Sequence, residues 1–193
     1  MVKLIGVNKI NTSVFISGNG TNLKNLIKFS KTYNSPIKIN IVISNKKKAY
    51  GIRYAKKNKI KIKIIDFSKK REIIHLLKVL ELNNIRLICL AGFLKILSKD
   101  FIKSFKGKII NIHPSLLPKY KGLDTHKRVL ENNEKITGCS VHFVNEKLDG
   151  GKIILQKKIK IFKKDNVKSL KKRVLKEEYK LYPKSIIKIF SNN

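Results

Sequence analysis

The first half of the chain alternates short apolar runs with longer amphipathic stretches. Such alternation is typical of strands and crossover helices in a parallel sheet. The predicted strands are Ser13–Ser17, Ile37–Ser44, Ile60–Ile65, Ile85–Ala91 and Lys108–Ile112. The predicted helices are Asn22–Tyr33, Lys48–Asn58, Lys69–Asn83 and Lys99–Phe105. In the third helix the apolar residues recur at helical spacing and form one stripe.

The pattern changes in the second half of the chain. A loop follows Pro118 and leads into a predicted short helix at Asp124–Glu131. Two β-rich runs come next, Gly138–Asn145 and Lys152–Phe162. A long charged helix closes the chain, and we expect Pro183 to interrupt or restart it because proline has no N–H to continue the helical hydrogen bonds. The predicted fold is α/β and Rossmann-like: a mostly parallel twisted sheet with helices on both faces and a C-terminal antiparallel extension.

Length and composition fit one globular domain. With 193 residues, 42% of them hydrophobic, the chain can bury a core of ordinary size. Its longest apolar run, Leu87–Leu94, is too short to cross a membrane, and the N-terminus lacks the features of a signal peptide. Cys89 and Cys139 lie in or beside strand-like runs, without the spacing of a metal site. We expect a cytoplasmic protein without membrane contact, disulfide or bound metal.

The formal charge of +33 attracts phosphate groups, but its make-up argues against sequence-specific binding of nucleic acid. Only five of the 45 basic residues are arginine, the residue whose bidentate fork specific readers favour, and the lysines are spread over every segment. We therefore expect no specific nucleic-acid partner and only weak attraction to polyanions. The same charge favours phosphorylated small substrates.

The first candidate site is the loop Ser17–Asn22, which reads Ser-Gly-Asn-Gly-Thr-Asn between the first strand and the first helix. Small residues let the backbone approach an anion, and N–H groups at a helix start favour negative charge, so the loop suits a phosphate. Leu23 stands where a dinucleotide-binding fingerprint needs its third glycine, and the loop is not a P-loop. An alternative of similar weight is a tight turn in which Thr21 or Asn22 caps the helix.

The second candidate is the pair Asn111 and His113 at the end of the fifth predicted strand. Residues two apart on a strand point to the same side of the sheet, and ligands of open α/β sheets gather beyond the carboxyl ends of the strands. Pro114 keeps His113 extended. An amide donor beside a titratable imidazole suits a developing oxyanion and a proton transfer, as acyl transfer requires. On spacing alone, the commoner alternative is that both side chains satisfy loop backbone groups.

The third candidate is Asp149, in the sequence Leu-Asp-Gly-Gly between the two β-rich runs. Asp-Gly between strands is a strong hairpin signal, and by itself it favours an ordinary turn. Beside His113, however, the carboxylate would orient the imidazole, raise its pKa and form an acid/base pair with it. The other histidines, His75, His126 and His142, are expected to have a structural role or to support the catalytic residues without being catalytic themselves. Among these, His142 lies in the run that leads toward Asp149.

Several blocks of the sequence together resemble one family. They are Ser17–Asn22, Leu90–Ser98, Asn111–Tyr120, Val141–Phe143 and Leu148–Gly151. In this order they resemble the phosphoribosylglycinamide formyltransferases, folate-dependent enzymes of purine synthesis, and the similarity covers nearly the whole chain. The block Asn-x-His-Pro-Ser-Leu-Leu-Pro is specific to the formyltransferase superfamily, and the first loop narrows the resemblance to this branch.

The resemblance implies a single formyltransferase domain over residues 1–193, with a nucleotide-binding half at about 13–110 and a folate and catalytic half at about 111–193. It implies that 10-formyltetrahydrofolate is the co-substrate and that N1-(5-phospho-D-ribosyl)glycinamide accepts its formyl group in the synthesis of IMP. The residues implied to be catalytic are Asn111, His113 and Asp149. Those implied to bind the ribonucleotide are Gly20, Thr21, Asn22 and Glu178. Those implied to bind the folate are Arg71, Leu94, Lys95, Ile96, Leu97 and Asn111.

In the mechanism that follows from the resemblance, Asn111 and a protonated His113 hold the tetrahedral oxyanion, and Asp149 keeps His113 charged. Two residues depart from the family pattern: Lys95 replaces an arginine of some members, and Asp124 stands where others have histidine. Partners are expected to be small-molecule substrates, with the chain a monomer or weak homodimer. Two alternatives stay open, namely hydrolysis of formyltetrahydrofolate and formyl transfer to another amine. A polyanion-binding protein on a degenerate scaffold is a third.

Overall fold

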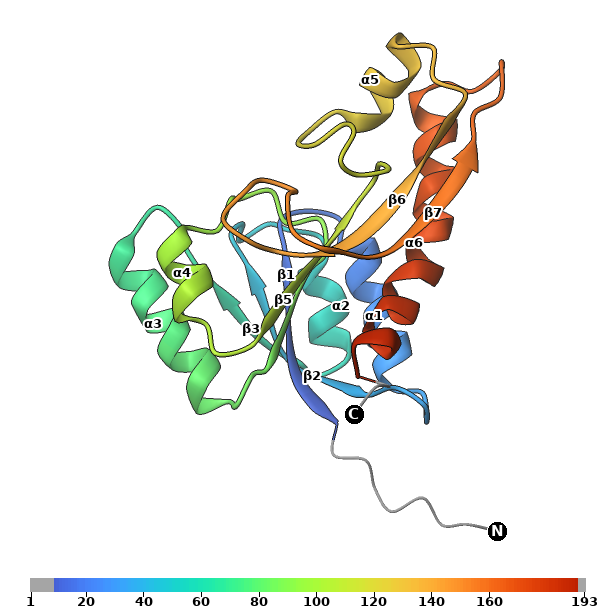
Figure 1. Cartoon of the computed structure of the whole chain (residues 1–193). Helices are drawn as coiled ribbons and strands as arrows, with labels where there is room; N and C mark the ends of the chain where they lie inside the picture. Colours follow the sequence, from blue (N-terminus) through green and yellow to red (C-terminus); the bar gives the residue numbers. More distant parts are fainter. Residues whose placement is uncertain (1–8, 191–193) are drawn as a thin grey trace.

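The computed structural model describes residues 9–190, which form one seven-stranded sheet with helices on both faces (Figure 1). The strands are β1 (Ile10–Ile16), β2 (Ile37–Ser44), β3 (Lys61–Ile64), β4 (Leu87–Leu90), β5 (Lys108–His113), β6 (Ile136–Phe143) and β7 (Ile153–Lys160). Their order in the sheet is β3-β2-β1-β4-β5-β6-β7. The first five are parallel, whereas β6 and β7 are antiparallel to their neighbours. The predicted α/β fold with an antiparallel extension is confirmed.

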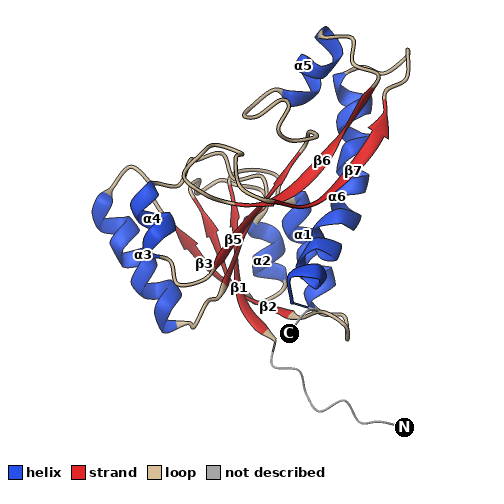
Figure 2. Cartoon of the chain, in the orientation of Figure 1, coloured by secondary structure: helices blue, strands red, loops and turns tan. Residues whose placement is uncertain are grey.

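The helices divide into two layers (Figure 2). They are α1 (Thr21–Ser30), α2 (Ile52–Lys57), α3 (Lys70–Leu82), α4 (Lys99–Ser104), α5 (Thr125–Glu131) and α6 (Val167–Phe190). Because side chains alternate along a strand, Val14 and Ile16 join the core under α1, α2 and α6, while Phe15 between them joins the core under α3 and α4. Both cores are built from buried aliphatic and aromatic side chains, so both faces of the sheet are covered.

The predicted elements agree with the structure except at their ends. The strand predicted at Ile37–Ser44 matches β2 residue for residue, and the other strands and helices differ by a few residues at their boundaries. The largest difference is at the start of one helix. Helix α2, predicted from Lys48, begins at Ile52 because residues before it form a turn in which the Ala49 N–H donates to the Lys46 carbonyl. Boundaries are the least certain part of any reading from periodicity.

The expectation that Pro183 interrupts the last helix is wrong, since α6 runs unbroken from Val167 to Phe190. Proline at this position cannot donate to the carbonyl four residues earlier, that of Tyr179. The Asn25 side chain of α1 donates to that carbonyl instead, with 2.7 Å between Nδ2 and the oxygen. A side chain from a neighbouring helix therefore replaces the missing backbone hydrogen bond, and the helix continues.

The topology creates one switch point, between β1 and β4. From β1 the chain proceeds outward to β2 and β3, then returns to place β4 and β5 on the other side of β1. The loops that follow β1 and β4 consequently leave the sheet in opposite directions and open a crevice at the carboxyl ends of the strands, the usual ligand site of such sheets. Among residues 9–190 the structure contains no helix suited to cross a lipid bilayer.

Candidate active site

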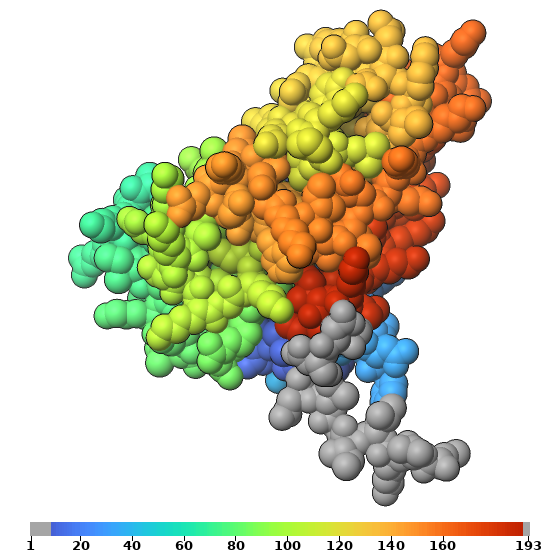
Figure 3. All heavy atoms as spheres, viewed as in Figure 1, coloured from blue at the N-terminus to red at the C-terminus, as the bar shows by residue number. Residues whose placement is uncertain are grey.

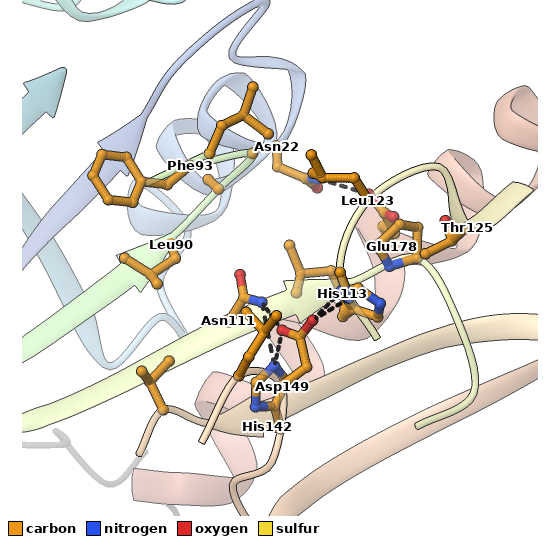
Figure 4. A pocket seen from close by; sticks show the side chains of 18 of the residues that line it. Asn22, Leu90, Phe93, Asn111, His113, Leu123, Thr125, His142, Asp149 and Glu178 are labelled. Atoms are coloured by element: carbon orange, nitrogen blue, oxygen red, sulfur yellow. Dashed lines mark hydrogen bonds and ion pairs between the residues drawn. The ribbon is translucent and has the colours of Figure 1, made fainter. Parts of the chain in front are cut away.

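A cavity of about 620 Å³ lies at the carboxyl ends of β1, β4 and β5. The loop after β1 and the segment after β4 form two of its walls, and α5, α6 and the loop after β6 form the others. Figure 4 shows Asn111, His113, His142 and Asp149 gathered together, and Asn22 joined to Glu178 by a hydrogen bond in the same cavity. The cavity therefore joins the first predicted loop to the three polar residues singled out in the sequence.

Asn111 and His113 point to the same side of β5, as their spacing predicted, and both line the cavity. Ile109, on the same face, is packed in the core under α3 and α4, so the two polar residues continue that face beyond the helices. His113 is only 5% exposed, and its Nδ1 lies 3.3 Å from Asp149 Oδ2. Its Nε2 lies 2.8 Å from the Tyr120 carbonyl oxygen, so the imidazole also contacts loop backbone.

β6 and β7 form the antiparallel hairpin that Asp-Gly indicated, but a loop longer than two residues joins them, and Asp149 lies in a turn of that loop in which the Gly150 N–H donates to the Lys147 carbonyl at 3.0 Å. A Cβ on Gly151 would overlap the Phe143 carbonyl, and the absence of a side chain there lets the loop close over the strand end. Asp149 itself has φ 46°, in the left-handed region. Its Oδ2 accepts a hydrogen bond from the Gly122 N–H at 2.9 Å, and its Oδ1 accepts one from Asn111 Nδ2 at 3.4 Å.

The same loop is joined to α4 by ion pairs. Glu146 pairs with Lys103 at 3.3 Å and with Lys99 at 3.6 Å, both in α4. Figure 3 shows this segment, in orange, lying against the yellow-green surface of α4. These exposed ion pairs are individually weak, but they connect the loop that carries Asp149 to the helix layer under Asn111.

His142, for which a structural or supporting role is expected, belongs to the polar cluster. It pairs with Asn111 in the register of β5 and β6, and its Nε2 lies 3.2 Å from Asn111 Nδ2 and 3.6 Å from Asp149 Oδ1. Its Nδ1 is 2.8 Å from the Phe143 carbonyl oxygen, which fits a donating Nδ1–H. In the sequence, His142 occupies one of the alternating positions of a predicted strand. That position indicates a place in the site only when β6 is known to pair with β5.

Burial dominates the electrostatics of His113. Removal from water lowers the pKa of His113 below its ordinary value, and the Tyr120 carbonyl and the Asp149 carboxylate offset this only in part. Burial also acts to raise the pKa of Asp149, but hydrogen bonds from His142 and the Gly122 N–H, with the charge that His113 carries when it is protonated, outweigh it and leave that pKa lowered. At neutral pH these two directions favour an ionised Asp149 beside an uncharged His113, whereas the mechanism implied by the resemblance uses a protonated imidazole.

The first loop forms the far wall of the cavity. Gly20 is the N-cap of α1, with φ 66°, and no side chain caps the helix, so the capping alternative for Thr21 or Asn22 is wrong. A Cβ on Gly20 would collide with the backbone of Gly51, which explains why this position needs glycine. Gly20, Thr21 and Asn22 all line the cavity at the start of α1, where N–H groups lack helical partners.

Glu178 of α6 reaches the same wall. It is 7% exposed, and Asn22 Nδ2 donates to its Oε2 at 2.7 Å. Burial raises the pKa of Glu178, while the hydrogen bond from Asn22 and the charge of Lys171 act in the opposite direction. The Asn22 Oδ1 is buried without a hydrogen-bond partner. Residues more than 150 positions apart in the chain thus form one polar wall.

The segment after β4 forms the third wall. Leu94, Lys95, Ile96 and Leu97 line the cavity; Leu97 is buried, whereas Leu94 and Ile96 are 59% and 74% exposed. Lys95 and Asp124, the two departures from the family pattern, also line it. Arg71 does not: it is an exposed residue in the first turn of α3, outside the residues that line the cavity.

An amide, an imidazole and a carboxylate thus face one cavity. We call its two sides arms: one is lined by the loop after β1 with Glu178, and the other by the segment Leu94–Leu97 after β4. Comparison with known proteins identifies the family in which this arrangement belongs. The chain belongs to the formyl transferase family, whose model matches residues 10–186.

Several relatives are more specific. The chain is 44% identical over 183 residues to the phosphoribosylglycinamide formyltransferase of Haemophilus influenzae, which covers 93% of this chain and 86% of that protein. It is 43% identical over 186 residues to the trifunctional purine biosynthetic protein adenosine-3 of Gallus gallus, where it covers 94% of this chain and spans only 18% of that protein. The crystal structure of glycinamide ribonucleotide transformylase 1 from Symbiobacterium toebii superposes with a TM-score of 0.89 at 33% identity, covering 96% of this chain and 90% of that one.

Proposed function

We propose that this chain transfers the formyl group of 10-formyltetrahydrofolate to the amine of N1-(5-phospho-D-ribosyl)glycinamide, the folate-dependent formylation of de novo purine biosynthesis. Membership of the formyl transferase family and the relatives named phosphoribosylglycinamide formyltransferase support the reaction. The observation that carries the proposal is the meeting of Asn111, His113 and Asp149 in one cavity between the first loop and the segment after β4. Acyl transfer needs groups of these three kinds around one carbon.

The two arms of the cavity divide the substrates. Gly20, Thr21 and Asn22 hold the phosphate of the ribonucleotide, because unpaired N–H groups at the start of α1 favour an anion. Glu178 is buried beside Asn22. It accepts a hydrogen bond from the same substrate when it is ionised, or donates one when it is protonated.

The opposite arm holds the folate. The backbone of Leu94–Leu97 borders the space next to Asn111 and supplies donors and acceptors to a flat heterocycle, with the apolar side chains around it. Lys95 fits this role because only its backbone is required. Arg71 lies outside the cavity, so its role is limited to a part of the folate that extends over α3.

The chemistry starts with attack of the neutral amine on the formyl carbon. A new C–N bond forms, and the carbonyl electron pair moves to oxygen. Asn111 Nδ2 donates to this oxyanion, and a preorganised donor of this kind contributes typically a hundred- to thousandfold in rate. Holding amine and formyl carbon in contact contributes further, up to about 7 to 11 kcal/mol in favourable cases.

A proton must then move from the attacking nitrogen to N10 of the folate as the C–N10 bond breaks. A neutral His113 is suited to this relay: it takes the proton as the oxyanion forms, when negative charge nearby favours the imidazolium, and returns it to the leaving nitrogen. Asp149 orients the imidazole and stabilises its charged form. Both ring nitrogens of His113 face protein oxygens, so one of these contacts is exchanged for the substrate.

The competing activity is hydrolysis of formyltetrahydrofolate, in which water replaces the amine. The arm formed by Asn22 and Glu178 disfavours it, because a hydrolase needs no second polar wall for an acceptor. A spectroscopic assay of tetrahydrofolate release, with and without the ribonucleotide, distinguishes the two. We expect release only when the ribonucleotide is present. Equal release without it would establish the hydrolase instead.

The setting proposed for the enzyme is the cytoplasm, with small molecules as its partners and a monomer or weak homodimer as its state. The formal charge of +33 opposes self-association and attracts both anionic substrates. Sedimentation at physiological salt tests the oligomeric state.

A further inference from the structure

Ser17 lies just before the part of the first loop that lines the cavity and is not itself a lining residue. It follows β1, is 2% exposed, and uses its hydroxyl twice. The Oγ accepts a hydrogen bond from the Leu94 N–H at 2.8 Å and donates one to Asn45 Oδ1 at 2.6 Å. The Ser17 N–H also donates to the Gly92 carbonyl at 3.1 Å. One small residue thus connects the loop after β1 to the segment after β4.

The loop after β1 is also braced from its other side. The Gly51 N–H donates to the Gly18 carbonyl at 3.0 Å, and Gly20 packs directly on Gly51. The segment after β4 has less support: Gly92 has φ 69°, and Leu94 and Ile96 are largely exposed. The firmly held loop therefore supports the more exposed segment, and the Ser17 hydroxyl is the side-chain link between them.

We propose that Ser17, with Asn45, is a positioning residue that couples the two substrate sites, so that occupation of the phosphate loop orders the Leu94–Leu97 backbone for folate. This inference rests on the proposed function for the identity of the two ligands. The hydroxyl touches neither ligand; it fixes the direction of the Leu94 N–H relative to Gly20–Asn22. Asn45 fixes the hydroxyl, because a serine that donates to Asn45 Oδ1 presents a lone pair to Leu94.

The test compares Ser17→Ala with Ser13→Ala. Ser13 is a matched control, since it is a fully buried serine within β1 whose hydroxyl donates to the Ile41 carbonyl at 3.2 Å, and it does not line the cavity. We expect Ser17→Ala to raise the KM for 10-formyltetrahydrofolate about tenfold, the loss of one hydrogen bond, with kcat changed much less. Ser13→Ala should leave both constants near their wild-type values.

Hydrogen–deuterium exchange of residues 91–97 measures the coupling between the two substrate sites in the absence of turnover. In the wild type, added ribonucleotide should slow exchange in this segment, and in Ser17→Ala it should not. A second pair of variants tests the same link if Ser17→Ala misfolds. Asn45→Asp keeps an acceptor for the Ser17 hydroxyl and should behave as wild type. Asn45→Ala removes that acceptor and should show part of the Ser17→Ala effect.

Failure of the coupling role can be distinguished from failure of the proposed function. If wild-type protein transfers formyl groups but Ser17→Ala binds folate and responds to ribonucleotide as wild type does, the coupling role is wrong and the proposed function stands. If wild-type protein neither transfers the formyl group nor responds to ribonucleotide, the proposed function fails and the coupling fails with it.

Discussion

Asn111 and His142 stand directly opposite each other on β5 and β6, with 3.2 Å between Asn111 Nδ2 and His142 Nε2. Both side chains also approach Asp149 Oδ1, at 3.4 Å and 3.6 Å. The antiparallel pairing of β6 with β5 therefore does more than extend the sheet. It places a second imidazole beside the carboxylate that faces His113; burial raises the pKa of Asp149, and the hydrogen bond from His142 is the largest of the contributions that lower it.

Removing His113 or Asp149 tests the catalytic cluster. His113→Ala and Asp149→Ala should each lower kcat about a hundred- to thousandfold, because each removes a group that acts on the transition state. Binding of the ribonucleotide, measured by calorimetry, should weaken far less, since its phosphate lies at the other wall. A variant that turns over near the wild-type rate would remove that residue from the mechanism.

His142 should act through Asp149 and not on the substrate directly. In His142→Gln we expect kcat to fall about tenfold, the equivalent of one good hydrogen bond. The hydrogen bond from His142 is the largest of the contributions that lower the pKa of Asp149, so its loss raises that pKa. The acid limb of the pH–rate profile should accordingly move to higher pH. An unchanged profile in a slow variant would mean that His142 only supports the strand.

The continuity of α6 through Pro183 depends on Asn25. Asn25→Ala should reduce the free energy of unfolding by about 1 to 2 kcal/mol, because it leaves the Tyr179 carbonyl without a donor.

Pro183→Ala supplies the matched background for this prediction, since alanine restores an N–H that reaches the same carbonyl. Urea unfolding of the two single variants and the double variant gives the coupling energy. The cost of Asn25→Ala should shrink when position 183 is alanine. Equal costs in both backgrounds would show that Asn25 does not replace the missing helical hydrogen bond.

His126 should make the protein less stable in mild acid. Burial, followed by the charge of Lys171, lowers its pKa from 6.5 to about 4. At neutral pH the imidazole is uncharged in both folded and unfolded states and has no effect. Between 6.5 and about 4 the unfolded chain takes up a proton that the folded protein does not, so stability falls as pH falls through this window.

His126→Gln removes this titration while keeping a polar side chain of similar size. Wild type should lose more unfolding free energy than the variant when the pH is lowered from 7 to 5, as urea denaturation measures. Parallel losses would assign the acid sensitivity to other groups.

Much of the architecture was readable from the sequence because its causes are local. Periodicity predicted strand β2 without error and predicted the succession of strands and helices along the chain. The spacing of Asn111 and His113 predicted that they share a side of β5, since that needs only a strand.

What escaped prediction depends on contacts between distant segments. The unbroken α6 depends on Asn25 of another helix, and the position of His142 depends on the pairing of β6 with β5. The lowered pKa of His113 depends on how deeply the loop around Tyr120 buries it, which no spacing reveals. In each case the deciding partner lies far away in the chain.

The central claim is that a formyl carbon passes from folate to the ribonucleotide amine. The most direct measurement uses 10-formyltetrahydrofolate labelled with carbon-13 in the formyl group, with the products analysed by mass spectrometry. We predict that the label appears in N-formylglycinamide ribonucleotide, in step with tetrahydrofolate, and that His113→Ala nearly abolishes it. Label recovered as free formate, with unmodified ribonucleotide, would contradict the account.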